Sequence, residues 1–153
     1  MAIARGYCTT GDVQLVNYYR DYLTNDLNSE RPTVLDVEGD IDFTIDDINL
    51  TLKTVGYTLP VVLADSPYGY NFVKYWNAVG AAEKLERRHG SKENADGLLE
   101  AYNRMEDQIL NHDVILTDVP GAPTQASIAE SGTSELTDSG DERVPFFTRE
   151  DKF

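Results

Sequence analysis

The densest group of side chains that could bind a metal ion lies in the first third of the chain. Residues 36–42 read DVEGDID, and alternating carboxylates of this kind supply the oxygen ligands of calcium loops. The sixth loop position would be Ile41, where the turn requires glycine, and the twelfth would be Asp47 in place of glutamate. We therefore interpret the run as a solvated acidic loop, and we expect no metal site and no cofactor.

Nucleophiles and acid–base residues are few and scattered. Cys8 is the only cysteine, and His89 and His112 have no second histidine at helical spacing. The chain contains no glycine-rich phosphate loop and no nucleophile elbow. We therefore predict that the chain is not an enzyme and has no catalytic residues, with Cys8 buried as a small apolar side chain.

A cluster of bases in the middle of the chain is the clearest candidate for contact with a charged partner. The patch consists of Lys84, Arg87, Arg88 and Lys92, beside His89. The whole chain has 27 acids against 13 bases, a net charge of −14, which disfavours nucleic-acid binding through overall charge. The patch could touch DNA phosphates, but we favour pairing with the chain's own acids or with an acidic neighbour.

The spacing of apolar residues predicts four helices. These cover residues 10–23, 44–55, 70–89 and 91–114. Gly56 ends the second helix and Ser91 caps the fourth, while the small residues of the third make it the expected central packing helix. Residues 25–42 are predicted as a loop because Pro32 and Gly39 interrupt them. The expected fold is all-α, a small bundle of about four helices with an extended C-terminal arm.

The composition changes near residue 121. Residues 113–142 hold seven acids and no base, and their Ser, Thr and Gly content is typical of a flexible arm. We predict a helical domain over residues 1–120 and a flexible acidic arm over residues 121–153. Solvated tails rarely end in exposed phenylalanines, so we expect the end of the arm to dock onto a neighbouring subunit or partner, with a frayed tail as the alternative. The docking residues would be Val144, Pro145, Phe146, Phe147 and Phe153.

The charge balance also bears on the environment of the protein. Only five lysines accompany eight arginines and sixteen aspartates, a balance that resembles proteins adapted to molar salt, with an ordinary acidic protein as the alternative. At about 1 M salt the Debye length of about 3 Å would screen the repulsion among the acids. No apolar run approaches the roughly 18 residues of a membrane span, so we expect a soluble protein with no membrane contact.

Two sequence features together resemble a known family. Residues 7–13 (YCTTGDV) open the first predicted helix, and residues 45–60 (IDDINLTLKTVGYTLP) carry the second helix into a proline turn. A long helix of small residues and a further amphipathic helix follow. This order, over about residues 7–121, resembles the head-tail connector (adaptor) proteins of tailed viruses.

That resemblance implies a structural virion protein and a set of partners. Twelve copies would typically form a ring beneath the portal protein and join it to the tail or a tail-completion protein. DNA would pass through the channel without sequence-specific binding, repelled by channel-facing acids. The protein would be assembled in the host cytoplasm and would lie in the neck of the virion, at the capsid–tail junction.

Two other functions remain open at this point. A tail-terminator or tail-completion subunit would be expected to have a β-rich core. A small acidic regulator that mimics DNA would be expected to remain a monomer in high salt and to bind a basic enzyme.

Overall fold

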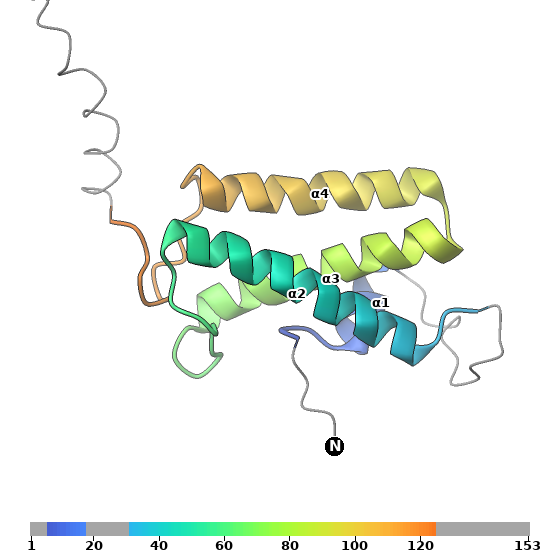
Figure 1. Cartoon of the computed structure of the whole chain (residues 1–153), viewed down its shortest axis with the longest axis horizontal. Helices are drawn as coiled ribbons and strands as arrows, with labels where there is room; N and C mark the ends of the chain where they lie inside the picture. Colours follow the sequence, from blue (N-terminus) through green and yellow to red (C-terminus); the bar gives the residue numbers. More distant parts are fainter. Residues whose placement is uncertain (1–5, 18–30, 125–153) are drawn as a thin grey trace, which may run out of the picture. The chain divides into compact units, whose positions relative to one another are not determined.

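The computed structural model describes residues 6–17 and 31–124 of the 153-residue chain. Four helices run through these residues, and no strand does. The helices are α1 (Thr10–Asn17), α2 (Val34–Val55), α3 (Pro67–His89) and α4 (Lys92–Leu110). The predicted all-α bundle of about four helices is therefore confirmed (Figure 1). From residue 125 onward the predicted arm, with its docking residues, lies outside the described part of the chain.

Helix α3 is the centre of the bundle and packs against the other three helices (Figure 1). Its buried small residues are Ala78, Gly80, Ala81 and Ala82. A Cβ atom on Gly80 would overlap the side chain of Thr44 in α2 and lie 2.7 Å from the ring of Tyr102 in α4. Glycine at this position therefore lets α2 and α4 approach α3 closely, and the expected central packing helix is confirmed.

The main core forms around Trp76, which is fully buried. Its ring packs against Phe72 and Tyr102, with centroid separations of 6.2 and 5.6 Å. Burial of large apolar side chains of this kind is worth about 1.5–3 kcal/mol each, so this cluster stabilises the packing of the helices. The fully buried side chains around it include Ile48, Leu52, Val73, Ile109 and Leu116.

A second, smaller cluster contains Cys8, which is buried as the sequence predicts. Its thiol donates to Oδ1 of Asn77 at 3.2 Å, and Nδ2 of Asn77 donates to the carbonyl of Ile41 at 3.1 Å. Burial, together with the nearby Asp12 carboxylate, raises the pKa of Cys8 to about 12. The thiol is therefore protonated at neutral pH, which fits a packing role.

The prediction of a loop over residues 25–42 is wrong from residue 34 onward, where α2 begins. Residues 25–30 of the predicted loop lie outside the described part of the chain. Thr33 and Asp36 form a capping box: Oγ1 of Thr33 accepts from the Asp36 backbone at 3.2 Å, and the Asp36 carboxylate accepts from the Thr33 backbone at 2.8 Å. Gly39 lies inside the helix, where glycine costs about 1 kcal/mol. Burial of Ile41 and its neighbours on the same helix outweighs that cost.

The acidic run of residues 36–42 consequently lies on a helix, and the interpretation of a solvated loop is wrong. Two of its four acids have structural roles. Asp36 belongs to the capping box, and Asp40 is buried against Arg88 of α3. The run therefore joins two helices instead of presenting its oxygens to one point.

Smaller differences concern helix ends. Helix α3 begins at Pro67, a residue that favours the first turn because its missing N–H would be unpaired there. Ser91 stands before α4 but makes no side-chain cap; instead its backbone N–H donates to Oε2 of Glu86 at 2.9 Å. Helix α4 ends at Leu110, short of the predicted residue 114. The part of the first predicted helix beyond Asn17 lies outside the described residues.

Gly56 ends α2 as predicted, with a left-handed φ of 108°. A Cβ atom on Gly121 would overlap the carbonyl of Gly56, so the segment after α4 passes directly against the end of α2. The chain divides into two units, Met1–Pro123 and Thr124–Phe153.

Candidate interaction surfaces

The outer face of α2 carries a line of exposed apolar side chains. Leu35, Phe43 and Leu50 are 61%, 60% and 67% exposed. At 3.6 residues per turn their spacing of eight and seven residues places them on one side of the helix. The opposite side holds the buried residues Val37 and Ile48. We call these three exposed residues the α2 stripe.

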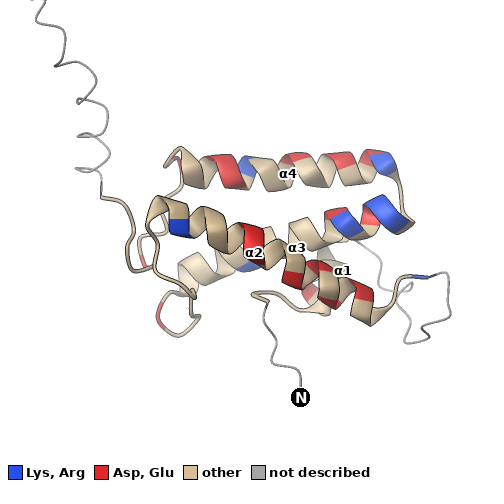
Figure 2. Cartoon of the chain, in the orientation of Figure 1, with Lys and Arg blue, Asp and Glu red and all other residues tan. Residues whose placement is uncertain are grey.

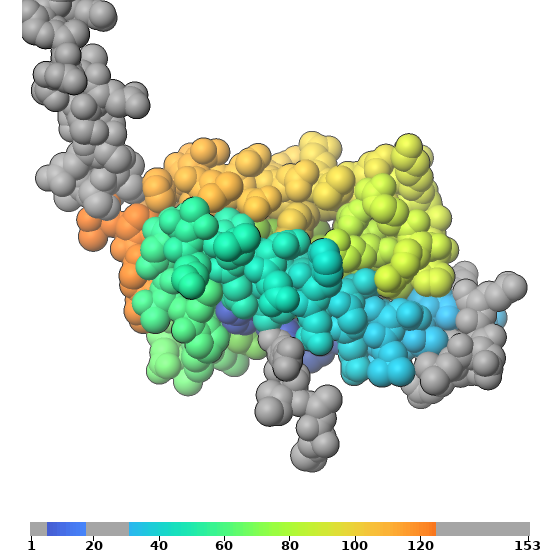
Figure 3. Space-filling view, viewed as in Figure 1, coloured from blue at the N-terminus to red at the C-terminus, as the bar shows by residue number. Residues whose placement is uncertain are grey.

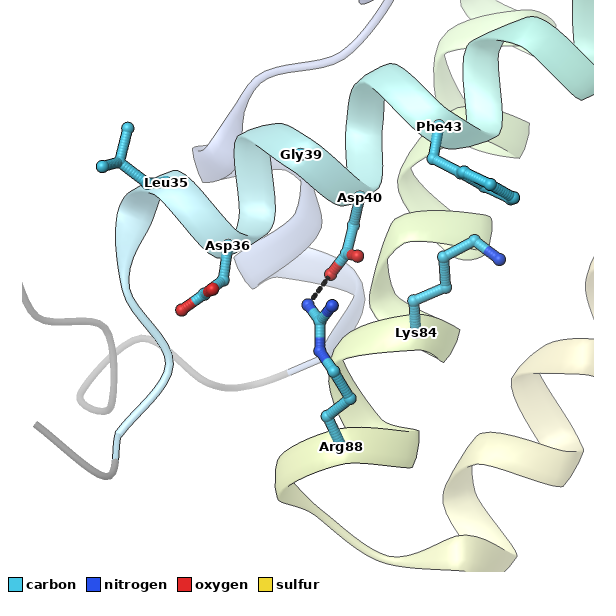
Figure 4. A pocket seen from close by; sticks show the side chains of 7 residues that line it. All are labelled: Leu35, Asp36, Gly39, Asp40, Phe43, Lys84 and Arg88. Carbon is cyan, nitrogen blue, oxygen red and sulfur yellow. Dashed lines mark hydrogen bonds and ion pairs between the residues drawn. The ribbon is translucent and has the colours of Figure 1, made fainter. Parts of the chain in front are cut away.

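A groove runs beside the first part of this stripe, between α2 and α3, and has a volume of about 400 Å³. In Figure 3 the N-terminal half of α2 (cyan) borders the C-terminal end of α3 (yellow-green) on the near face of the domain. Figure 4 shows the lining side chains, with bases from α3 reaching toward α2. The α2–α3 groove is lined by Leu35, Asp36, Gly39, Asp40, Phe43, Lys84 and Arg88.

An ion pair between α2 and α3 lies in the α2–α3 groove. Nη2 of Arg88 donates to Oδ2 of Asp40 (Figure 4). The Asp40 side chain is 6% exposed and that of Arg88 is 47% exposed. Burial raises the pKa of the Asp40 carboxyl, and the Arg88 charge opposes that rise. Arg88 therefore pairs with the buried carboxylate of Asp40, while about half of the Arg88 side chain remains exposed to solvent.

Lys84 behaves differently from the other bases of this region. Its Nζ lies 4.4 Å from the centroid of the Phe43 ring, a cation–π contact across the two helices. Among the described residues its ammonium group makes no ion pair with an acid. The groove thus combines an exposed aromatic ring with a positive charge that has no carboxylate partner in this part of the chain.

The predicted basic patch is therefore split by the fold. Arg87 pairs with Glu83 at 2.5 Å and with Asp96 at 3.3 Å, so Arg87, like Arg88, pairs with the chain's own acids. Lys84 lies in the α2–α3 groove, and Lys92 is exposed at the start of α4. Figure 2 shows basic positions (blue) at the adjoining ends of α3 and α4, with acidic positions (red) along the same helices. The pairing favoured from the sequence holds for the two arginines.

A second groove lies between α1 and α3 and has a volume of about 360 Å³. Its exposed apolar residues are Leu15 and Tyr75, which are 62% and 57% exposed. Nζ of Lys74 pairs with Oδ1 of Asp12 at 2.9 Å across it. Burial acts to raise the pKa of Asp12, but hydrogen bonds from Lys74 and Thr9 outweigh it and lower the pKa. The α1–α3 groove is lined by Asp12, Leu15, Val16, Asn71, Lys74, Tyr75 and Ala78.

The two grooves lie beside different halves of the central helix. The α1–α3 groove is lined by α3 residues between Asn71 and Ala78, and the α2–α3 groove is lined by Lys84 and Arg88. The grooves share no lining residue. The domain therefore presents two unlike, partly apolar surfaces.

The α2 stripe is the part of these surfaces that sequence reasoning missed. Its signal was present, because the stripe residues alternate along the chain with the buried series from Val37 to Leu52. Pro32 and Gly39 hide this helical spacing in the sequence, because both residues disfavour a helix. The capping box of Thr33 and Asp36 would have given the helix start from sequence alone.

Two further kinds of site, a metal site and a membrane-spanning helix, are absent from the described residues. No three of their His, Cys, Asp or Glu side chains are grouped so that they could hold a metal. None of their helices is both long and apolar enough to cross a membrane. His112, at a φ of 59°, has a buried Nδ1 with no hydrogen-bond partner, and it stands apart from both grooves.

Comparison with known proteins gives no relative: no family model, no curated protein and no solved structure matches the chain. The function is therefore inferred from the two grooves, the charge of the chain and the order of its elements.

Proposed function

We propose that this chain is a structural virion protein, a head-tail connector that forms a ring between the capsid portal and the tail. The observation that carries the proposal is the pair of separate, partly apolar grooves beside the two halves of α3. A ring closed by head-to-tail contacts needs two different patches on every subunit. The stripe residue Leu50 and the α1–α3 groove residue Tyr75 are the exposed apolar anchors for such a contact.

The charge of the chain supports a channel role. Acidic side chains recur along α2 and α4 (Figure 2), within a chain of net charge −14. Acids that face a channel repel the phosphates of passing DNA, so the genome would move through the ring without sequence-specific binding. In this proposal the partners are further copies of the chain, the portal protein and a tail or tail-completion protein, and the location is the neck of the virion.

The order of elements supports this function over the alternatives. A tail-terminator or tail-completion subunit was expected to have a β-rich core, whereas all regular elements of residues 6–17 and 31–124 are helices. A DNA-mimicking regulator acts as a monomer, and two exposed apolar surfaces would be a liability for it. We propose no enzymatic activity for the domain.

The proposal is tested on the full chain in about 1–2 M salt, where self-repulsion is screened. Electron microscopy and light scattering should show closed rings for the wild-type chain. Tyr75→Ser should abolish them, because it removes an anchor that is 57% exposed and outside the core. Leu110→Ser, at a 43% exposed position outside both grooves, is the matched control and should leave the rings intact.

The virion location is tested separately by mass spectrometry of purified particles. The chain should be present in mature particles together with the portal protein. A chain that is absent from particles, or that remains a monomer in high salt and binds a basic enzyme, would contradict the connector function and favour the regulator.

A further inference from the structure

The rim of the α2–α3 groove exposes two large apolar side chains to solvent. Leu35 and Phe43 lie at its rim, and each is about three-fifths exposed. Covering one such side chain is worth about 1.5–3 kcal/mol. No described segment of the chain covers them, since both remain exposed with residues 6–17 and 31–124 in place.

The charged side chains of the groove indicate the charge of a partner that could bind there. Lys84 has no carboxylate partner among the described residues, and the Arg88 side chain keeps 47% of its surface in solvent. Both bases belong to the lining. The lining also contains two acids, but Asp40 pairs with Arg88 and Asp36 accepts a hydrogen bond in the capping box. The base left for a partner is therefore Lys84, and beside the apolar rim it fits a peptide that combines aromatic and acidic residues.

The chain itself contains a peptide of this composition. Residues 141–147 read DERVPFF, with two acids followed closely by two phenylalanines. Beyond Tyr102 the only aromatic residues are Phe146, Phe147 and Phe153. Pro145 restricts the residue before it to extended backbone, which suits a segment laid along a groove.

The place where the chain leaves the domain sets which grooves the peptide can reach. The backbone N–H of Thr58 donates to the carbonyl of Pro120 at 2.7 Å, so the exit lies at the C-terminal end of α2. Phe43 lies thirteen residues before Gly56, about 20 Å away along the helix. The 22 residues from Thr124 to Phe146 span at most about 75 Å, enough to reach the groove of a neighbouring subunit as well as the chain's own. The ring of the proposed function makes the neighbour's groove the one that the arm fills.

We propose that the α2–α3 groove of one copy binds residues 141–147 of a second copy. Phe146 and Phe147 contact Leu35 and Phe43, and the acids at positions 141 and 142 lie toward Lys84. This inference rests on the proposed function only in taking the partner to be another subunit of the ring. It adds an arm-exchange contact to the contact between domains.

The experiment uses two full-length variants, both carrying Tyr75→Ser so that the contact between domains is removed. One variant adds Phe43→Ser, which disables the groove and keeps the arm. The other adds Phe146→Ser and Phe147→Ser, which disable the arm and keep the groove. Light scattering in about 1 M salt measures the mass of each variant alone and of their equimolar mixture.

Arm exchange predicts monomers for each variant alone and a one-to-one complex in the mixture, because the intact arm of one finds the intact groove of the other. Charge reversal by Lys84→Glu in the groove-intact variant should weaken the complex at least tenfold when the mixture is measured in about 0.1 M salt, where the Debye length of about 10 Å leaves the attraction largely unscreened. The same mixture carrying Leu110→Ser in that variant should associate normally. Circular dichroism checks that every variant remains helical.

Failure of the mixture to associate, with both variants folded, would overturn the arm exchange, and so would binding that survives Lys84→Glu and Phe43→Ser together. If wild-type rings still form in that case, the connector function stands without the arm contact. Complex formation by a chain that is absent from virions would instead retain the arm exchange and contradict the connector function.

Discussion

The carboxylate of Asp118 accepts hydrogen bonds from the backbone N–H of Gly69 at 3.0 Å and of its neighbour Tyr68 at 2.7 Å. Asp118 thereby caps the first turn of α3 from 49 residues further along the chain. Ser66 adds to this contact by donating from Oγ to the Asp118 carbonyl at 2.7 Å. Because a carboxylate also suits the positive end of a helix, this one residue fixes the segment after α4 onto the start of the central helix.

Asp118→Ala should lower the free energy of unfolding by about 1–2 kcal/mol, since two backbone donors lose their acceptor. Asp113→Ala is the matched control, because Asp113 is exposed on the same segment, and it should change stability by less than about 0.5 kcal/mol. Chemical denaturation in high salt measures both. Equal stability of the two variants would contradict a capping role for Asp118.

The ion pair of Asp40 and Arg88 predicts that the stability lost on removing Arg88 depends on pH. Arg88→Ala should destabilise the domain at pH 7 by about 1–3 kcal/mol, because it leaves a buried carboxylate without its partner. Burial already raises the pKa of Asp40, and loss of the guanidinium raises it further. Protonation relieves the unpaired charge, so the defect should shrink as the pH falls toward the ordinary carboxyl pKa.

The double variant Asp40→Asn with Arg88→Ala should recover part of the lost stability at pH 7. Arg104→Ala is the control for removing an arginine whose pair, with Glu100, is exposed on both sides, and its effect should stay within about 0.5 kcal/mol. A defect of Arg88→Ala that is independent of pH would argue against an unpaired Asp40.

The capping box of α2 also predicts a loss of stability that depends on pH. Hydrogen bonds from the side chain and backbone of Thr33 lower the pKa of Asp36 below its ordinary 3.8. A carboxyl with a depressed pKa in the folded state stabilises the fold above pH 3.8 and loses that contribution as the pH falls through its folded value. Asp36→Ala should therefore unfold at a lower temperature than wild type at pH 6, and the gap should narrow below about pH 3.8.

Thermal unfolding followed by circular dichroism at a series of pH values measures this gap. Glu38→Ala is the control, because Glu38 is an exposed acid of the same helix with no capping bond. A gap of the same size at pH 6 and pH 2.5 would contradict the capping box as a source of stability.

Two glycines inside helices should respond to alanine with opposite signs. A Cβ atom at Gly97 meets nothing within 4 Å, so Gly97→Ala should stabilise the domain by about 0.5–1 kcal/mol through helix propensity. At Gly80 the added atom would overlap Thr44, so Gly80→Ala should destabilise it by about 1–3 kcal/mol despite the same gain in propensity. Denaturant unfolding of both variants tests the packing of α3; stabilisation by both would refute the close approach.

Gly56→Ala tests the end of α2. Gly56 has a φ of 108°, a conformation that costs a side-chain-bearing residue about 1–2 kcal/mol. Gly39→Ala in the same helix, where a Cβ meets nothing within 4 Å, should instead raise stability by about 0.5–1 kcal/mol. Melting temperatures that move in the same direction for both variants would contradict the left-handed cap.

Local signals in the sequence determined that the fold is all-helical and where most of its helices end. The apolar periodicity of α3 and α4 and the stop at Gly56 follow from side chains a few residues apart. Such signals are readable because a helix repeats every 3.6 residues and its end groups need nearby partners. Local signals do not reveal the first half of α2, because Gly39 disfavours a helix there. The buried face that stabilises this half forms only when α2 packs against the rest of the domain.

Only the tertiary structure decided which helix faces remain exposed. The sequence shows apolar residues at Leu35, Phe43 and Tyr75 but not that all three point away from the core. It also cannot join Asp40 to Arg88, because those residues are 48 positions apart and meet only when α2 crosses α3. Periodicity defines the faces of a helix, whereas packing against a partner determines which face is buried.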